Sequence, residues 1–96
     1  MTAGSIRLKA EDGRGRYSID SGAGEAELTY VIDNHNNLVI DHTYTPPAAR
    51  GKGLALALVE RAVADAAAQG RKVAPQCSYA ARVFDDRPDW RLLRAS

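Results

Sequence analysis

A strand ends and a helix begins within the stretch Thr43-Tyr44-Thr45-Pro46-Pro47-Ala48-Ala49-Arg50-Gly51-Lys52-Gly53-Leu54-Ala55. The two prolines stop strand pairing, and the two glycines let a ligand approach the backbone closely because no Cβ intervenes. The first N–H groups of a helix have no intrahelical partner and carry the positive end of its dipole. The stretch therefore predicts a site for phosphate or pyrophosphate, where Arg50 and Lys52 add positive charge.

Three strands are expected before this junction. Residues 16–20 and 25–33 alternate polar and apolar side chains, and residues 38–45 are rich in β-branched and aromatic ones. Glycine-rich and asparagine-rich turns separate these runs, which predicts an antiparallel meander over residues 15–45. Residues 1–14 are polar and end close to two glycines, so we expect a loosely ordered start.

Two helices and one strand are expected after the junction. Residues 51–69 contain seven alanines with apolar residues at i+4 spacing, and Gly70 follows as a C-terminal cap. Residues 71–76 are expected to form a short strand, and Ser78 is the expected N-cap of a second helix. The order β-β-β-α-β-α predicts a single α+β (mixed α/β) domain over residues 1–96, a twisted, mainly antiparallel sheet with the alanine-rich helix packed across it.

The composition excludes several classes of protein. The 96 residues include 13 Lys+Arg and 12 Asp+Glu, and a net charge of +1 argues against binding nucleic acid through overall charge. The longest apolar run, residues 54–59, is too short to span a membrane, and the N-terminus does not resemble a secretory signal. One cysteine forms no internal disulfide, and two scattered histidines indicate no metal site. We expect a cytoplasmic protein.

The charge is distributed unevenly along the chain. Residues 1–49 carry a net charge of −3, and residues 50–96 carry +4. An anionic ligand held by the second half would fit this division. Solvated faces that meet across a sheet would explain it equally well.

The loop matches one known kind of anion site better than two others. The phosphate loop of nucleotide hydrolases needs a longer glycine spacing followed by Lys and Ser or Thr, and a dinucleotide fold needs a third glycine and a later acidic residue. The pattern Arg-x-x-Gly-x-Ala, formed by Arg50, Gly53 and Ala55, resembles instead the acetyl-CoA pyrophosphate loop of the GNAT acetyltransferase superfamily. Together with His-Thr-Tyr-Thr-Pro-Pro at 42–47 and Val-Ala-Pro-Gln-Cys-Ser-Tyr at 73–79, the chain resembles the short stand-alone GNAT-like N-acetyltransferases.

This resemblance implies a minimal GNAT-like fold with acetyl-CoA as cofactor. Backbone N–H groups after Arg50 would hold the pyrophosphate, and the strand before the loop would pair its backbone with the pantetheine arm. The resemblance assigns the following residues to cofactor binding: Thr43, Tyr44, Thr45, Arg50, Gly51, Lys52, Gly53, Leu54 and Ala55.

Cys77 and His42 are the candidate catalytic residues. Cys77 precedes the second helix, whose dipole would favour a thiolate, and the short family is similar in placing a cysteine here. A small buried residue is the competing interpretation, and residue statistics favour it. His42 could act as a base, but strict alternation places it on the face of Ile40, so we favour a core position. Tyr79 could protonate a departing thiolate, although packing beneath the helix is the preferred interpretation.

The implied function is transfer of an acetyl group from acetyl-CoA to an amine, small molecule or protein. Either the amine attacks the thioester directly or Cys77 first takes up the acetyl group, and the residues do not choose between these routes. Larger acetyltransferases build an acceptor pocket from helices and strands that this chain lacks. The acceptor site is therefore open, formed by a second subunit in a homodimer, or absent. If it is absent, the alternative is a non-catalytic acyl-CoA-binding or sensing module that acts through a protein partner.

Overall fold

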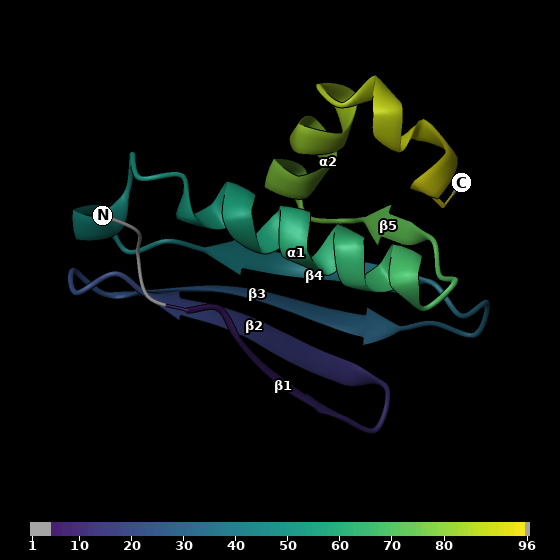
Figure 1. The fold of residues 1–96 in the computed structure, drawn as a ribbon, viewed down its shortest axis with the longest axis horizontal. Coiled ribbons are helices and arrows are strands. Elements are labelled where there is room, and N and C mark those ends of the chain that lie inside the picture. The colour runs from purple at the N-terminus through teal and green to yellow at the C-terminus, as the bar shows by residue number, and fades with distance from the viewer. Residues whose placement is uncertain (1–4, 96) are drawn as a thin grey trace.

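The computed structural model describes residues 5–95, which form one sheet with the helices packed on one side (Figure 1). Residues 1–4, part of the expected loose start, lie outside the described residues. In chain order the elements are β1 (Arg7–Glu11), β2 (Arg14–Asp20), β3 (Glu25–Ile32), β4 (Leu38–Tyr44), a 3₁₀ helix (Pro47–Ala49), α1 (Leu54–Ala68), β5 (Val73–Pro75), α2 (Ser78–Asp85) and a second 3₁₀ helix (Pro88–Leu93).

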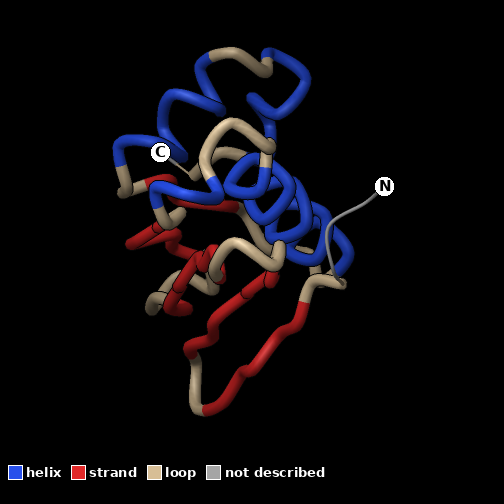
Figure 2. The backbone as a smooth tube through the Cα atoms, turned by 90° about the vertical axis from the view of Figure 1, so that its left-hand side faces the viewer, coloured by secondary structure: helices blue, strands red, loops and turns tan. Residues whose placement is uncertain are grey.

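The strands lie in the order β1-β2-β3-β4-β5. The first four are antiparallel neighbours, and β5 is parallel to β4 because α1 carries the chain back along the sheet. Figure 2 shows the helices gathered on one side, so the other face of the sheet, the open face, has no helix over it among residues 5–95. The predicted α+β class and mainly antiparallel sheet are confirmed.

The core lies between the sheet and α1. Leu28 from β3 and Ile40 from β4 are fully buried against Leu58 and Ala62, which share one face of α1. Burial of side chains of this size stabilises a fold by about 1.5–3 kcal/mol each, so this layer fixes where α1 lies. The i+4 apolar pattern that predicted the helix is also the pattern that packs it.

The start of the chain is more ordered than predicted. Residues 7–11 form β1, and Asp12 and Gly13 turn the chain into β2 with φ angles of 48° and 77°. Two successive positive φ angles are typical of a tight hairpin, so Gly13 marks a turn and not a break in structure. Every residue of β1 is exposed, which is why this strand lacked the apolar pattern that revealed the others.

The two edges of the sheet differ. At the β5 edge, Val73 pairs with Arg94, and its carbonyl accepts a hydrogen bond from the N–H of Ala95 at 2.8 Å. At the other edge, β1 pairs with β2 on its inner side, and among the described residues nothing pairs with its outer side. Within residues 5–95, the outer backbone of β1 is therefore unpaired.

The glycines at the two ends of α1 set its limits. The helix was predicted from residue 51 but begins at Leu54, because Gly53, its N-cap, has a φ of 73° and lies outside the helical region. At the other end, Gly70 also has a φ of 73°, and its N–H donates to Ala67 while the next N–H donates to Ala66. That pattern confirms the predicted glycine cap.

Candidate functional site

β4 and β5 share only a short pairing. Leu38, Val39 and Ile40 pair with the three residues of β5, and the Ile40 carbonyl then accepts from the N–H groups of Gln76 and Cys77 at 3.0 and 3.1 Å. Among the described residues, no strand pairs with this side of β4 beyond that point. The second half of β4 therefore has a backbone edge that another extended molecule can use.

The loop that follows β4 is open on its outer side. Gly51 and Gly53 have φ angles of 83° and 73°, and no atom lies within 4 Å of where a Cβ would stand on either residue. The guanidinium of Arg50 reaches back, and its Nε donates to the Thr45 carbonyl at 3.0 Å. Ala49 is fully buried and anchors the loop to the core. The loop backbone is thus anchored to the core at Ala49 and open to solvent at Gly51 and Gly53.

A hollow of about 170 Å³ lies at this loop. The residues around it come from the end of β4, the loop, the first turn of α1 and the start of α2: Thr45, Ala49, Arg50, Gly51, Gly53, Leu54, Ala55, Leu56 and Tyr79. Five of them are predicted cofactor-binding residues in the loop and helix, and Thr45 is the sixth. The structure therefore brings most of that predicted set to one place.

The start of α1 is electropositive. The Gly53 carbonyl accepts from Ala57 at 3.0 Å, which leaves the N–H groups of the first turn without partners inside the helix. That first turn, all of it described, contains no acidic residue, and Arg50 and Lys52 are both exposed beside it. Helix dipole and side-chain charge act in the same direction, so the arrangement can hold an anion.

Cys77 lies at the N-terminus of α2, where β4 and β5 stop pairing. It is itself the N-cap, one residue before the predicted cap Ser78, and its Sγ accepts a hydrogen bond from the N–H of Ala80 at 3.4 Å. The Oγ1 of Thr43 lies 3.4 Å from the same sulfur. The side chain is partly exposed and also packs against the hydrophobic core.

His42 lies on the open face and not in the core, which corrects the sequence prediction. Thr29 pairs with His42, but Tyr30 pairs with Ile40, so Asp41 has no residue opposite it. Such a bulge reverses the alternation of side chains beyond it. The His42 side chain is 52% exposed, and its Nε2 lies 3.2 Å from a Glu27 carboxylate oxygen.

The bulge separates the two predicted catalytic residues. Thr43 pairs with the fully buried Leu28 and so lies on the helix-covered face, where it meets Cys77, while His42 lies on the other face. The structure therefore does not bring His42 and Cys77 together. The signal in the sequence was the pair of consecutive polar residues at 41 and 42, which interrupts the alternation of β4.

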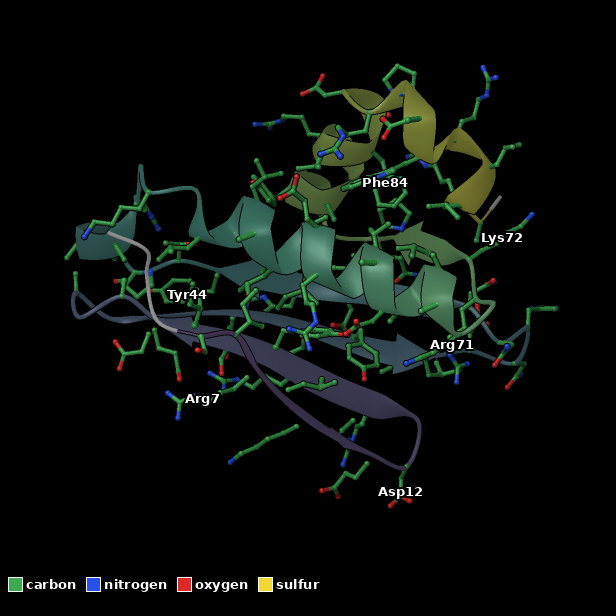
Figure 3. The ribbon with its side chains drawn as sticks, in the orientation of Figure 1. Arg7, Asp12, Tyr44, Arg71, Lys72 and Phe84 are labelled. Carbon is green, nitrogen blue, oxygen red and sulfur yellow. The ribbon has the colours of Figure 1, made fainter. Side chains whose placement is uncertain are left out.

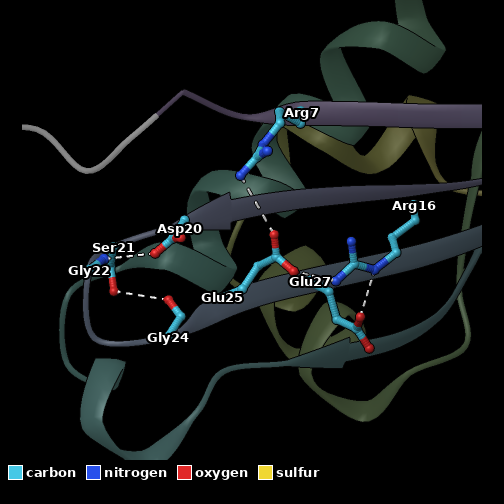
Figure 4. A network of polar contacts seen from close by, with 8 residues as sticks. All are labelled: Arg7, Arg16, Asp20, Ser21, Gly22, Gly24, Glu25 and Glu27. Carbon is cyan, nitrogen blue, oxygen red and sulfur yellow. Dashed lines mark hydrogen bonds and ion pairs between the residues drawn. The ribbon is translucent and has the colours of Figure 1, made fainter.

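The open face around His42 is held by ion pairs (Figure 4). Arg16 donates from Nε to Glu27 at 2.7 Å and from Nη2 to Glu25 at 2.9 Å. Nη2 of Arg7 lies 3.8 Å from Oε2 of Glu25. The hydrogen bond from Arg16 lowers the pKa of the Glu25 carboxyl below its usual value. Glu27, the partner of His42, is thus already part of a charged network.

Tyr44 and Tyr79 occupy different positions in the site. Tyr44 is exposed at the loop end of β4, far from Arg71 and Lys72, which follow α1 at the opposite end (Figure 3). Tyr79 is half-buried beside the loop hollow, where burial and then the nearby Cys77 raise the pKa of its hydroxyl above the ordinary value. The Tyr79 hydroxyl therefore stays protonated near neutral pH, and the side chain packs against the core.

Two features are absent from residues 5–95. In this part of the chain, no group of three His, Cys, Asp or Glu side chains lies close enough to hold a metal ion. None of the described helices is long and apolar enough to cross a membrane.

A comparison with known protein families gives one match over most of the chain. A protein-family model described as GCN5-related N-acetyl-transferase matches residues 16–93. The matched region begins in β2 and ends in the last 3₁₀ helix, so it contains the strand–loop–helix junction and Cys77. The five-stranded mixed sheet with its helices is compatible with a minimal form of the fold that the sequence resemblance implied.

Proposed function

The chain belongs to the GCN5-related N-acetyltransferase family, and from that premise we propose that it binds acetyl-CoA and transfers the acetyl group to an amine. Family membership supports a general acetyltransferase-like function. The observation that supports acetyl-CoA as the ligand is the open loop at Gly51 and Gly53. Neither residue has a side chain, and the space that a Cβ would occupy is empty.

The loop would hold the pyrophosphate. The N–H groups of Gly51, Lys52, Gly53, Leu54 and Ala55 lie at or just before the free end of α1, and Arg50 and Lys52 supply charge. Because Arg50 is tied to the Thr45 carbonyl, its guanidinium is already placed at the loop before a ligand arrives. Pre-placed charges spend less free energy on ordering when they bind.

The second half of β4 would hold the pantetheine arm. The backbone of Thr43, Tyr44 and Thr45 follows the last residue that pairs with β5, and an extended amide-containing chain can add to such an edge. An arm bound along this edge with its pyrophosphate at the loop would point its other end toward the sulfur of Cys77. Tyr79 lines the hollow at the loop, and its hydroxyl can donate a proton.

Acetyl-CoA supplies an acetyl group activated as a thioester. On the covalent route, Sγ of Cys77 would bond to the acetyl carbon as the thioester C–S bond breaks, and the thiol proton of Cys77 would pass to solvent while the departing CoA sulfur takes up a proton; the N–H of Ala80 stabilises negative charge on Sγ. Alternatively, Cys77 only borders the site and the amine takes the acetyl group directly. In either route, His42 cannot be the base for Cys77 in this conformation, because the two lie on opposite faces of the sheet.

Binding of CoA measured by calorimetry tests the loop. A Gly53→Ala variant should bind CoA at least about tenfold more weakly, because a Cβ would occupy the cradle and the positive φ would be strained. Gly70→Ala is the matched control, since Gly70 has the same φ of 73° and equally open surroundings at the other end of α1. Equal affinities in the two variants would overturn the loop assignment.

Intact-mass measurement with acetyl-CoA tests the chemistry. Wild type and Cys77→Ala are incubated with a panel of amines, and free CoA and protein mass are followed. An acetyl adduct lost in Cys77→Ala indicates the covalent route, and CoA release that persists in Cys77→Ala indicates direct attack. Binding of acetyl-CoA with neither adduct nor release favours the alternative function, a non-catalytic acyl-CoA-binding module that acts through a protein partner.

A further inference from the structure

Among the described residues, the sulfur of Cys77 has two polar contacts, and they come from different elements. The N–H of Ala80 belongs to the first turn of α2 and lies 3.4 Å from Sγ. The hydroxyl of Thr43 belongs to the unpaired half of β4 and also lies 3.4 Å from Sγ. Both distances are within hydrogen-bonding range for sulfur, so the thiol lies between the strand and the helix at the point where β4 and β5 separate.

The hydroxyl of Thr43 differs from the N–H of Ala80 in what it can do. A backbone N–H only donates, whereas a threonine hydroxyl has one donor and two acceptor sites and can rotate to suit its partner. It can accept from the S–H of a neutral thiol and can donate to the sulfur of a thiolate. A hydrogen bond to the charged form favours that form.

The bulge at Asp41 is what brings Thr43 to this position. Without the extra residue, alternation from Ile40 would turn Thr43 to the open face and place His42 beside α1. With it, Thr43 lies opposite the buried Leu28 and faces the sulfur. Because of the bulge in β4, the neighbour of Cys77 is the hydroxyl of Thr43 and not the imidazole of His42.

We propose that Thr43 is the positioning residue of Cys77, and that its hydroxyl holds the sulfur in place and donates to it when the thiol loses its proton. The proposal rests on the function above only in giving Cys77 a role toward the thioester. The thiol proton passes to solvent or to a bound base, and the hydroxyl of Thr43 keeps its own proton throughout.

The rate of alkylation by iodoacetamide measures this contact directly. The thiolate sulfur bonds to the reagent carbon as iodide leaves, and the chain has a single cysteine, so the reaction reports on Cys77 alone. Near neutral pH, Thr43→Val should react at least about tenfold more slowly than wild type, the lower end of what one hydrogen bond to a charged group contributes. Thr43→Ser should stay within about twofold of wild type because it keeps the hydroxyl.

Two controls separate the hydroxyl from general effects on the fold. Ser21→Ala removes a hydroxyl from the turn between β2 and β3, where the Ser21 hydroxyl donates to the Gly24 carbonyl at 3.2 Å, and should leave the alkylation rate unchanged. Circular dichroism checks that each variant is folded, and Thr43→Ala replaces Thr43→Val if the latter is not. A wild-type rate in Thr43→Val, or an equal loss in Thr43→Ser, overturns the proposal.

Alkylation requires no acetyl-CoA, so its result is independent of the proposed enzyme activity. If the rates follow the expected order but no acetyl adduct forms on Cys77, Thr43 positions the thiol and the covalent route fails. If an adduct forms and the rates do not depend on the Thr43 hydroxyl, the positioning role fails and the covalent route stands.

Discussion

The two halves of β4 differ in their neighbouring strands and in their burial. Leu38, Val39 and Ile40 are buried and pair with strands on both sides, whereas His42 to Tyr44 pair with β3 alone and are mostly exposed. A bulge separates the halves and reverses the direction of the side chains. One strand can therefore support the core in its first half and present backbone, hydroxyl and loop to a ligand in its second.

Truncation in the first half should have the largest effect on stability. Ile40 is fully buried, so Ile40→Ala should lower the free energy of unfolding by about 2–5 kcal/mol in urea denaturation. Tyr44→Ala, in the exposed half, should change it by less than about 0.5 kcal/mol. Similar losses in both variants would mean that the two halves are not energetically distinct.

Removal of charge beyond the second half should affect binding and not folding. Arg50→Ala should weaken CoA binding by about tenfold, because a charge-assisted contact to phosphate is lost, and should leave the denaturation midpoint nearly unchanged. Arg71→Ala removes a partly buried arginine beyond the far end of α1 and serves as the control. An affinity loss of the same size in Arg71→Ala would point to overall charge in place of a loop contact.

Removal of the His42 side chain tests the bulge. An exposed ion pair contributes little, so His42→Ala should change the free energy of unfolding by no more than about 0.5 kcal/mol. A histidine packed in the core would cost several times as much. Urea denaturation distinguishes the two, and a large loss would return His42 to the helix-covered face that strict alternation predicted.

The smallest effect concerns pH. Arg16 lowers the pKa of Glu25, so this carboxylate stabilises the fold above its ordinary pKa, and the contribution is lost as pH falls through the lowered value. Glu25→Gln should therefore be slightly less stable than wild type near neutral pH, and the difference should disappear as pH falls through the lowered pKa of Glu25. Added salt should shrink the difference at neutral pH, because the pair is exposed. A difference that persists in acid would contradict this cause.

The parts predicted well from the sequence are those encoded by neighbouring residues. The i+4 spacing of α1, its cap at Gly70 and the glycine loop after Arg50 are local patterns, and the structure contains α1, the cap and the loop. The face on which His42 lies depends on how β4 pairs with β3, which no local pattern contains.

Two other errors had different physical causes. β1 escaped prediction because an exposed edge strand needs no apolar pattern. The cap of α2 was placed one residue late because serine is a far commoner cap than cysteine. The hydroxyl of Thr43 gained its neighbour through both the bulge and this cap, so the sequence alone predicted Thr43 only for its backbone.

The uneven edges of the sheet have a consequence for behaviour in concentrated solution. The β5 edge is shielded by hydrogen bonding to Arg94 and Ala95, which added electrolyte does not weaken. The β1 edge has only its alternating charges, Arg7, Lys9 and Glu11, to discourage strand addition by another molecule. Salt screens such charges, so at high ionic strength we expect aggregation to begin by strand pairing at β1.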